Sequence, residues 1–516
     1  MPVRQHRTLP FLAAVAAAAL LCAAAADAGA TGDALGYDGA RHLLNRTGFG
    51  ANEAEIERYA VMSREQAART LLDGTRAAAA TPPPAWTAEP GPLRYPRRGA
   101  GATDAERKQF RQQQVREGLQ LRGWWIGEML ATPSPLTERM TLFWHNHFVS
   151  SQQKVKLAEL MYRQNVTLRA QALGNFGAML HAIARDPAMI VYLDSAQNRR
   201  GAPNENFARE LMELFTLGQG NYGEHDIKEV ARAFTGWSLD RDSGEFRFRP
   251  FLHDYGSKTV LGRTGRFDGD DVVDILLAQP ATAEFVTRKL WREFVSPDPD
   301  RAEVRRIAAR FRDSGYDVKT ALYALLTSDA FYARENRGTL VKSPVDLVVG
   351  TLRQFGLQPG DTISFAVAAA GMGQNLFSPP NVKGWPGQEA WINTSSLLAR
   401  KQFLDRLFRA NGSILPSAAE SAMGEPAAVP AANAAENPDK ARAARFLRAV
   451  DHSIGSVQFD SAAWFAQWKA PRDASPRNDD AIRLLFAVPP QNAPPPEPES
   501  VALVRALVLD AAYELE

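Results

Sequence analysis

The chain has 516 residues, of which 45% are hydrophobic and 23% are charged, and its formal net charge is +2. This is an ordinary globular composition, and its small net charge does not indicate a nucleic acid or an acidic membrane as a partner. Beyond the N-terminal segment, no uninterrupted apolar run reaches about 18 residues, so we expect no membrane span.

The N-terminus is typical of a secretory signal peptide. Arg4 and Arg7 precede the apolar run LPFLAAVAAAALLCAAAADAGA, which ends in small residues. We therefore expect residues 1–30 to be removed and the protein to be exported, to the periplasm or out of the cell. The single cysteine, Cys22, lies inside this segment. The mature protein is thus expected to contain no disulfide, thiol nucleophile or cysteine-bound zinc.

Apolar residues recur mainly at helical spacing along the remaining chain, and no alternating run of β-branched residues predicts a large sheet. The fold class that we predict is mainly α: a large helical domain with a small β-hairpin insertion and a C-terminal appendage. The predicted helices are Thr103–Ala131, Leu136–Phe148, Leu157–Leu173, Phe176–Ala184, Glu205–Leu217, Asp226–Phe234, Val272–Leu277, Ala281–Phe294, Ala302–Ser314, Val318–Thr327, Pro344–Phe355 and Thr394–Asn411.

The segment FWHNHF, residues 143–148, holds two histidines and an asparagine among three large aromatic residues. Its surroundings have a helical period, and on a helix His145 and His147 would point about 200° apart, so they could not both bind one metal ion. One histidine could face a cleft while the other packs in the core. A histidine with satisfied hydrogen bonds in the core is the alternative.

The segment PNENFARELMELFTLG, residues 203–218, sets three glutamates and an arginine inside a short apolar stretch. Glu210 and Glu213 are neighbours at i and i+3 along one side of the predicted apolar stripe. A close carboxylate pair beside a buried face can raise the pKa of one member while the other stays ionised, as acid/base catalysis near neutral pH requires. The alternative is a solvated helix face with Arg209 and Arg232 as counter-charges.

A predicted strand pair lies near the midpoint of the chain, and the predicted linker and appendage lie nearer its C-terminus. A strand pair is expected within EFRFRPFLHDYGSKTVLG, residues 245–262. An Ala/Pro-rich stretch, residues 413–438, is typical of a linker. We therefore predict a main helical domain over residues 31–412, this linker, and an appendage over residues 439–516.

Six blocks carry a resemblance to a known family: RHLLNRTGFG (41–50), FWHNHF (143–148), PNENFARELMELFTLGQGNYGEHDIKEVARAFTGW (203–237), HDYGSKTVLG (253–262), KSPVDLV (342–348) and SPPNVKGWPGQEAWINTSSLLAR (378–400). Over residues 38–410 the chain resembles the bacterial domain-of-unknown-function family numbered 1800. The resemblance implies an exported bacterial protein, with a second exported bacterial protein as a candidate partner. It supplies no reaction, cofactor or catalytic residue. Gly223 stands where the family usually has Thr, so the hydroxyl half of a capping box with Asp226 is missing.

Function is therefore predicted from the residue types in these blocks. Carboxylates can protonate a glycosidic oxygen, amides can bind hydroxyl groups, and indole rings can pack on the apolar faces of sugars. We predict an exported carbohydrate-active enzyme, a glycoside hydrolase or a related polysaccharide-cleaving enzyme, with no cofactor expected and a polysaccharide or glycan as substrate. The candidate catalytic residues are Glu205, Glu210 and Glu213. The candidate substrate-binding residues are His145, Asn146, His147, Asn204, Arg209, Trp237, His253, Asp254, Trp385 and Trp391.

Two alternatives belong to other classes. In a metal-dependent exported enzyme, a divalent metal ion would be held by one of the FWHNHF histidines, His253, Asp254 and one glutamate. In a non-enzymatic cell-envelope binding or assembly protein, the carboxylates would instead form a buried ion-pair network. The arginines expected in that network are Arg41, Arg46, Arg209 and Arg232.

Overall fold

The computed structural model describes residues 33–88, 103–240, 243–409, 438–468, 477–495 and 499–516. Over these residues the chain is mainly helical, as predicted, with two short antiparallel hairpins. The predicted signal peptide and residues 413–437 of the predicted linker lie outside the described residues. No helix in the described part of the chain combines the length and the apolar character needed to cross a membrane.

The described α-helices are α2 (Gly36–Thr47), α3 (Glu53–Ala60), α4 (Arg64–Asp73), α5 (Asp104–Ala131), α6 (Pro135–His147), α7 (Gln152–Val155), α8 (Ala158–Gln171), α9 (Phe176–Ala184), α10 (Pro187–Tyr192), α11 (Glu205–Glu210), α12 (Glu224–Ala233), α13 (Gly269–Leu277), α14 (Pro280–Phe294), α15 (Arg301–Asp313), α16 (Val318–Leu326), α17 (Asp329–Tyr332), α18 (Pro344–Gln354), α19 (Thr362–Gly371), α20 (Thr394–Arg409), α22 (Pro438–Gly455), α23 (Ser461–Phe465), α24 (Arg477–Leu485) and α25 (Val501–Val508). Short 3-10 turns are η1 (Ala85–Ala88), η2 (Ser195–Gln197), η4 (Pro250–Leu252), η5 (Arg334–Asn336), η6 (Gln388–Trp391) and η7 (Ala511–Glu514), and η3 (Leu211–Thr216) is a π-helix.

Side-chain caps fix several helix starts. At the start of α5, the hydroxyl of Thr103 accepts the N–H of Glu106, whose carboxylate accepts the N–H of Thr103 in return. At the start of α12, the N–H of Gly223 donates to Asp226 Oδ2 at 2.9 Å. Glycine has no hydroxyl to complete that box, so this cap is the half box that the sequence predicted.

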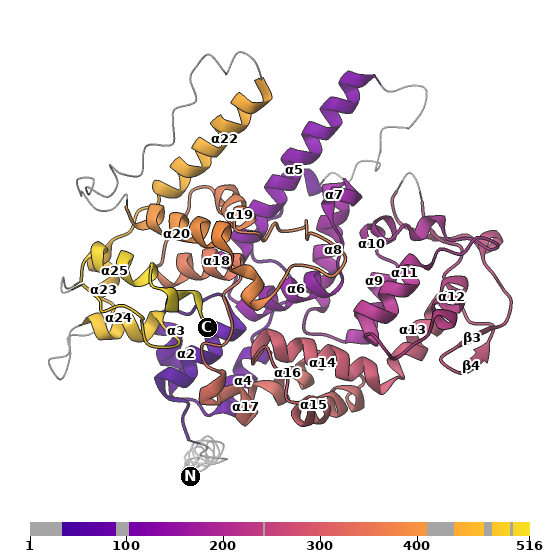
Figure 1. Ribbon diagram of the computed structural model, residues 1–516, viewed down its shortest axis with the longest axis horizontal. Helices are drawn as coiled ribbons and strands as arrows, with labels where there is room; N and C mark the ends of the chain where they lie inside the picture. The colour runs from indigo at the N-terminus through magenta and orange to yellow at the C-terminus, as the bar shows by residue number, and fades with distance from the viewer. Residues whose placement is uncertain (1–32, 89–102, 241–242, 410–437, 469–476, 496–498) are drawn as a thin grey trace, which may run out of the picture.

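The helices form one elongated body around a continuous hydrophobic core (Figure 1). Helices α5, α6, α8, α18 and α19 occupy its middle, α14 to α16 lie beside them, and α9 to α13 with the hairpins form one end. Helices α20 and α22 to α25 form the other end. The first half of α5 and the first half of α22 project from the body on the same side in Figure 1.

The predicted strand pair within residues 245–262 is divided between two hairpins. Strand β1 (Trp237–Leu239) pairs with β2 (Phe246–Phe248), and β3 (Lys258–Val260) pairs with β4 (Arg263–Gly265). The second hairpin closes through Leu261 and Gly262, whose φ angles are 48° and 78°. Positive φ at both positions matches the twist of the flanking strands in a two-residue hairpin turn. β2 therefore pairs with an earlier segment, and β3 pairs with a later one.

The segment predicted as a C-terminal appendage packs into the same core. The indole N–H of Trp464 donates to the carbonyl of Gln354 at 3.0 Å, and the hydroxyls of Tyr513 and Thr351 lie 2.9 Å apart. Trp464 and Tyr513 are both buried. Because α18 and the C-terminal segment bury each other, the segment predicted as an appendage packs as part of the helical body.

A buried ion-pair network joins the same parts of the chain. Arg139 lies 2.8 Å from a carboxylate oxygen of Glu293, 2.5 Å from Asp346 and 3.3 Å from Glu516. The predicted network was built on four other arginines, of which Arg209 and Arg232 pair with carboxylates nearer the surface. Arg46 is buried but donates to four backbone carbonyls, among them those of Phe294 and Val295. Arg46 therefore provides hydrogen-bond donors for backbone carbonyl groups at chain ends and turns.

Candidate functional site

The glutamate-rich segment forms two kinds of helix. α11 (Glu205–Glu210) continues without a break into the π-helix η3 (Leu211–Thr216), where one uniform α-helix to Leu217 was predicted. The N–H of Leu217 donates at 2.8 Å to the carbonyl of Met212, five residues back. A π-turn inside a helix is rare and frequently marks a functional site. It also changes the direction of the side chains after Glu210.

Two side chains hold the end of this π-helix. His147 Nε2 lies 3.1 Å from the carbonyl oxygen of Phe215, and Lys289 Nζ donates at 3.2 Å to the carbonyl of Leu214. Lys289 Nζ also lies 3.1 Å from His147 Nδ1, so a neutral imidazole would donate from Nε2 and accept at Nδ1. Burial, then the charge of Arg292, lowers the pKa of Lys289 to about 7. Burial, then the charge of Lys289, holds the pKa of His147 well below its usual value.

His145 belongs to a different environment. Its Nε2 lies 3.1 Å from Asn165 Nδ2, and its ring packs 4.7 Å from Trp125 and 5.3 Å from Phe377. Burial, followed by the charge of Arg169, lowers its pKa to about 3. Both FWHNHF histidines are therefore buried and neutral, and neither faces a cleft.

Asn146, between them, fixes a distant loop. Its Oδ1 accepts the backbone N–H of Trp385 at 2.7 Å. A Cβ at Gly384 would lie 2.2 Å from the same oxygen, and Gly384 has a φ of +94°, so only glycine fits this approach. The loop is thereby docked on α6, with the exposed Lys383 beside the glutamates of the π-helix.

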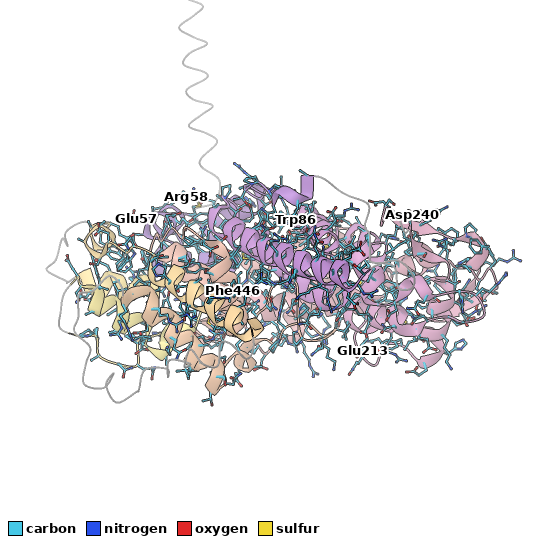
Figure 2. All side chains as sticks on the ribbon, turned by 90° about the horizontal axis from the view of Figure 1, so that it is seen from above. Glu57, Arg58, Trp86, Glu213, Asp240 and Phe446 are labelled. Carbon is cyan, nitrogen blue, oxygen red and sulfur yellow. The ribbon has the colours of Figure 1, made fainter. Side chains whose placement is uncertain are left out.

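Glu210 and Glu213 lie close enough to interact but differ in environment. Burial, then repulsion from Glu213, raises the pKa of Glu210. Glu213 accepts hydrogen bonds from Gln219 at 2.7 Å and from Tyr222 at 2.9 Å, and the first of these is the largest cause that lowers its pKa. Lys383 lowers the pKa of both carboxyl groups. Glu213 lies at the rim of the molecule in Figure 2, so the pair is open to solvent on one side.

Glu205 lies apart from this pair, at the start of α11. It is 3.6 Å from Arg209, which forms two hydrogen bonds of 2.9 and 3.0 Å with Glu224. Arg209 thus serves as a counter-charge on the surface, which is the alternative that the sequence left open for it. Glu205 itself lines an open groove of about 720 Å³.

The same groove contains Asn204, but the amide of this residue is used by the fold. Asn204 Oδ1 caps α11 by accepting the N–H of Asn206 at 3.0 Å, and its Nδ2 donates to the carbonyl of Asp194 at 3.2 Å. Asn204 therefore shapes the groove rather than offering free donors to a ligand. The residues that line the groove are Ala196, Gln197, Arg199, Ala202, Pro203, Asn204, Glu205 and Leu252.

The three tryptophans predicted to bind substrate are buried. Trp237 is 4% exposed, Trp385 5% and Trp391 6%. Trp237 packs against Phe234 and Phe246 with ring centroids 4.9 and 5.0 Å away. A ring this deeply packed cannot offer a free face to a sugar, so these residues stabilise the core in this conformation.

His253 and Asp254 hold the loop between the hairpins. His253 Nδ1 lies 2.8 Å from the carbonyl of Thr235, and the His253 ring is buried. Arg232 Nε donates at 2.8 Å to Asp254, and this pairing is the largest cause that lowers the pKa of Asp254 to about 2. Within the described residues, no group of three His, Cys, Asp or Glu side chains is arranged to bind a metal ion. The predicted metal ligands do not converge.

Several residues around the carboxylate pair were not predicted. Three of them lie inside the family-like blocks and two lie outside, and their spacing gave no sign of a shared site, because helix packing and loop docking bring them together. These residues are Tyr192, Gln219, Tyr222, Lys289 and Lys383.

Comparison with known proteins gives one match. A family model described as "Protein of unknown function (DUF1800)" matches residues 42–490, which include most of the C-terminal segment. No curated protein and no solved structure matches the chain.

Proposed function

The chain belongs to the DUF1800 family of proteins of unknown function, and we propose from its site that it is an exported carbohydrate-active enzyme that cleaves glycosidic bonds. One observation carries this proposal: the environments of Glu210 and Glu213 move the pKa values of two neighbouring carboxyl groups in opposite directions. Such a pair provides one protonated acid and one carboxylate at the same pH. Cleavage of a glycosidic bond requires these two groups.

In this proposal Glu210 is the general acid. Its raised pKa favours the protonated form, which can donate a proton to the leaving glycosidic oxygen. Glu213, ionised and held by Gln219 and Tyr222, is the carboxylate that either attacks the sugar or activates a water molecule. Lys383 limits the repulsion between the two carboxylates when both are ionised.

Export is the second part of the proposal. It is supported by the basic residues and the apolar run within residues 1–30. An exported enzyme would meet polysaccharides of the cell surface or the environment. No cofactor is part of the proposed reaction, because proton transfer and a carboxylate suffice for it.

The test uses Glu210→Gln and Glu213→Gln, with Glu57→Gln as the matched control. Glu57 is an exposed glutamate, well apart from Glu213 in Figure 2. On a panel of soluble polysaccharides, release of reducing ends by the unmodified protein should be lost in both site variants and retained in the control. Melting temperatures should be unchanged, or higher for Glu210→Gln, because a glutamine removes the repulsion. Absence of reducing-end release from the unmodified protein would overturn the proposal.

A second candidate belongs to a different class. The burial of the candidate tryptophans and of both FWHNHF histidines favours a non-enzymatic cell-envelope protein, in which these residues only build the scaffold. In that case both glutamate variants would alter stability or partner binding, and the unmodified protein would turn over no glycan.

A further inference from the structure

A patch of exposed aromatic rings lies at the end of the molecule formed by α9 to α13 and the hairpins. Among the described residues, ten large hydrophobic side chains are exposed, and three of them fall within eight positions of the chain. Phe251 is 71% exposed, Tyr255 57% and Phe248 39%. Exposed apolar side chains that gather in one place mark a binding surface more often than scattered ones do.

The patch is built on a firm support. The rings of Tyr255 and Phe248 pack against the buried ring of His253, with centroids 4.7 and 5.5 Å away. His253 is fixed in turn by its hydrogen bond to the carbonyl of Thr235. The buried ring of His253 thus restrains two exposed rings, which reduces the conformational entropy that they lose when a ligand binds.

The groove beside Glu205 adjoins this patch. Leu252, the neighbour of Phe251 on turn η4, lines the groove, and its carbonyl accepts the N–H of Arg200 at 2.7 Å. The other wall is tied by the N–H of Asn204, which donates to Asn198 Oδ1 at 2.9 Å. Both walls are therefore fixed by hydrogen bonds within the fold.

Polar groups in the groove remain available. The side chains of Gln197 and Arg199 are exposed and form no hydrogen bond or ion pair with the rest of the described chain. With Glu205 they offer amide, guanidinium and carboxylate groups. The groove volume of about 720 Å³ lies within the range of small-molecule sites.

We infer that the groove and the rings of Phe251 and Tyr255 together form an oligosaccharide-binding subsite, distinct from the Glu210 and Glu213 pair. A sugar chain presents hydroxyl edges, which suit the polar groove, and apolar faces, which suit exposed aromatic rings. Glu205 and Glu210 lie on one helix, five residues or about 7.5 Å of axial rise apart. The subsite would thus hold part of the glycan whose cleavage is proposed above, and this inference rests on that proposal for its ligand class.

Calorimetric titration with three hexasaccharides, of glucose, N-acetylglucosamine and mannuronate, tests the subsite. At least one should bind the full protein, and Phe251→Ala or Tyr255→Ala should each weaken its binding about tenfold. Gln197→Ala, which removes a free amide and no contact within the fold, gives a second independent variant. Phe446→Ala is the matched control, because Phe446 is a 40% exposed ring on α22, far from the groove. The affinity of the Phe446→Ala variant for the bound hexasaccharide should be unchanged.

The outcomes separate the two proposals. Binding that the aromatic variants weaken, without cleavage by the unmodified protein, supports the subsite and contradicts the proposed reaction. Cleavage with binding that all variants retain supports the reaction and overturns the subsite. Absence of binding for all three hexasaccharides, or an equal loss in the Phe446→Ala control, also overturns it.

Discussion

His147 Nε2 lies 3.1 Å from the carbonyl oxygen of Phe215, and this contact joins two family-like blocks through residues 68 positions apart in the chain. The carbonyls at the end of a helix have no partner within it. His147 and Lys289 supply partners for two of them at the end of the π-helix that carries the candidate acids. His147, which was predicted as a substrate contact, thus supports the backbone of the candidate site.

Replacing His147 should therefore destabilise the fold. His147→Leu leaves the carbonyl of Phe215 and the amine of Lys289 without this partner inside the core, at a cost of about 1–3 kcal/mol for an unsatisfied buried group. Urea denaturation measures the loss. The control is His225→Gln, because His225 is exposed, and it should leave the free energy of unfolding unchanged. Equal losses in the two variants would contradict the supporting role.

The proposed glycosidic-bond cleavage should have a bell-shaped dependence on pH, with one limb set by Glu210 and the other by Glu213. Glu210 must be protonated, so activity should fall as pH rises through its raised pKa. Glu213 must be ionised, so activity should fall as pH decreases through its lowered pKa. A profile of initial rate against pH measures both limbs. Lys383→Met removes a nearby cation and should move both limbs to higher pH, and limbs that stay in place would contradict these assignments.

The ion pair of Asp254 with Arg232 should stabilise the protein only above acidic pH. The folded pKa of Asp254, about 2, lies below the usual pKa of an aspartate, 3.8, so its contribution is present above about pH 4 and is lost as pH falls towards 2. Asp254→Asn should cost about 1 kcal/mol at pH 7, because both partners are partly exposed. Unfolding measured at pH 7 and at pH 2 should show this difference shrinking, and a constant difference would indicate a loss of packing instead.

The buried network around Arg139 should be far more sensitive than a surface pair. Arg139→Met leaves the carboxylates of Glu293, Asp346 and Glu516 without their shared counter-charge, and breaking a buried pair in this way costs about 3–5 kcal/mol. The matched control is Arg107→Met, whose exposed pair with Asp104 contributes at most about 1 kcal/mol. Chemical denaturation of both variants measures the contrast, and similar small losses would show that the network is solvated.

Local patterns predicted most of the helices but not how the helices meet. The segment Thr103–Ala131 was predicted within one residue of α5, because the helical spacing of apolar residues is a local signal. The π-turn after Glu210 was missed, since it depends on partners such as Lys289 that helix packing supplies. Local patterns also did not show that Trp385 is buried or that the C-terminal segment packs into the core. An aromatic residue gives the same sequence pattern whether it packs inside or lies on the surface.

The sequence did indicate one property of the site. The spacing of Glu210 and Glu213 beside an apolar stripe predicted a close pair with unequal carboxyl groups, and their pKa values move apart. The partners that cause the difference, Gln219 and Tyr222, come from the turn after the π-helix. Gln219 and Tyr222 contact Glu213 only because the folded chain brings this turn back to the pair, so the sequence alone did not indicate these contacts.

Gly384 packs so closely against Asn146 that the backbone shape of this loop influences the electrostatic potential at Glu210 and Glu213. A methyl group at position 384 would collide with the amide oxygen and force the backbone of the loop outward, and Lys383 would move with it. The carboxyl groups would then lose part of a positive field, although nothing that touches them had changed. The smallest residue in this loop thus sets how acidic a pair of glutamates on another element can be.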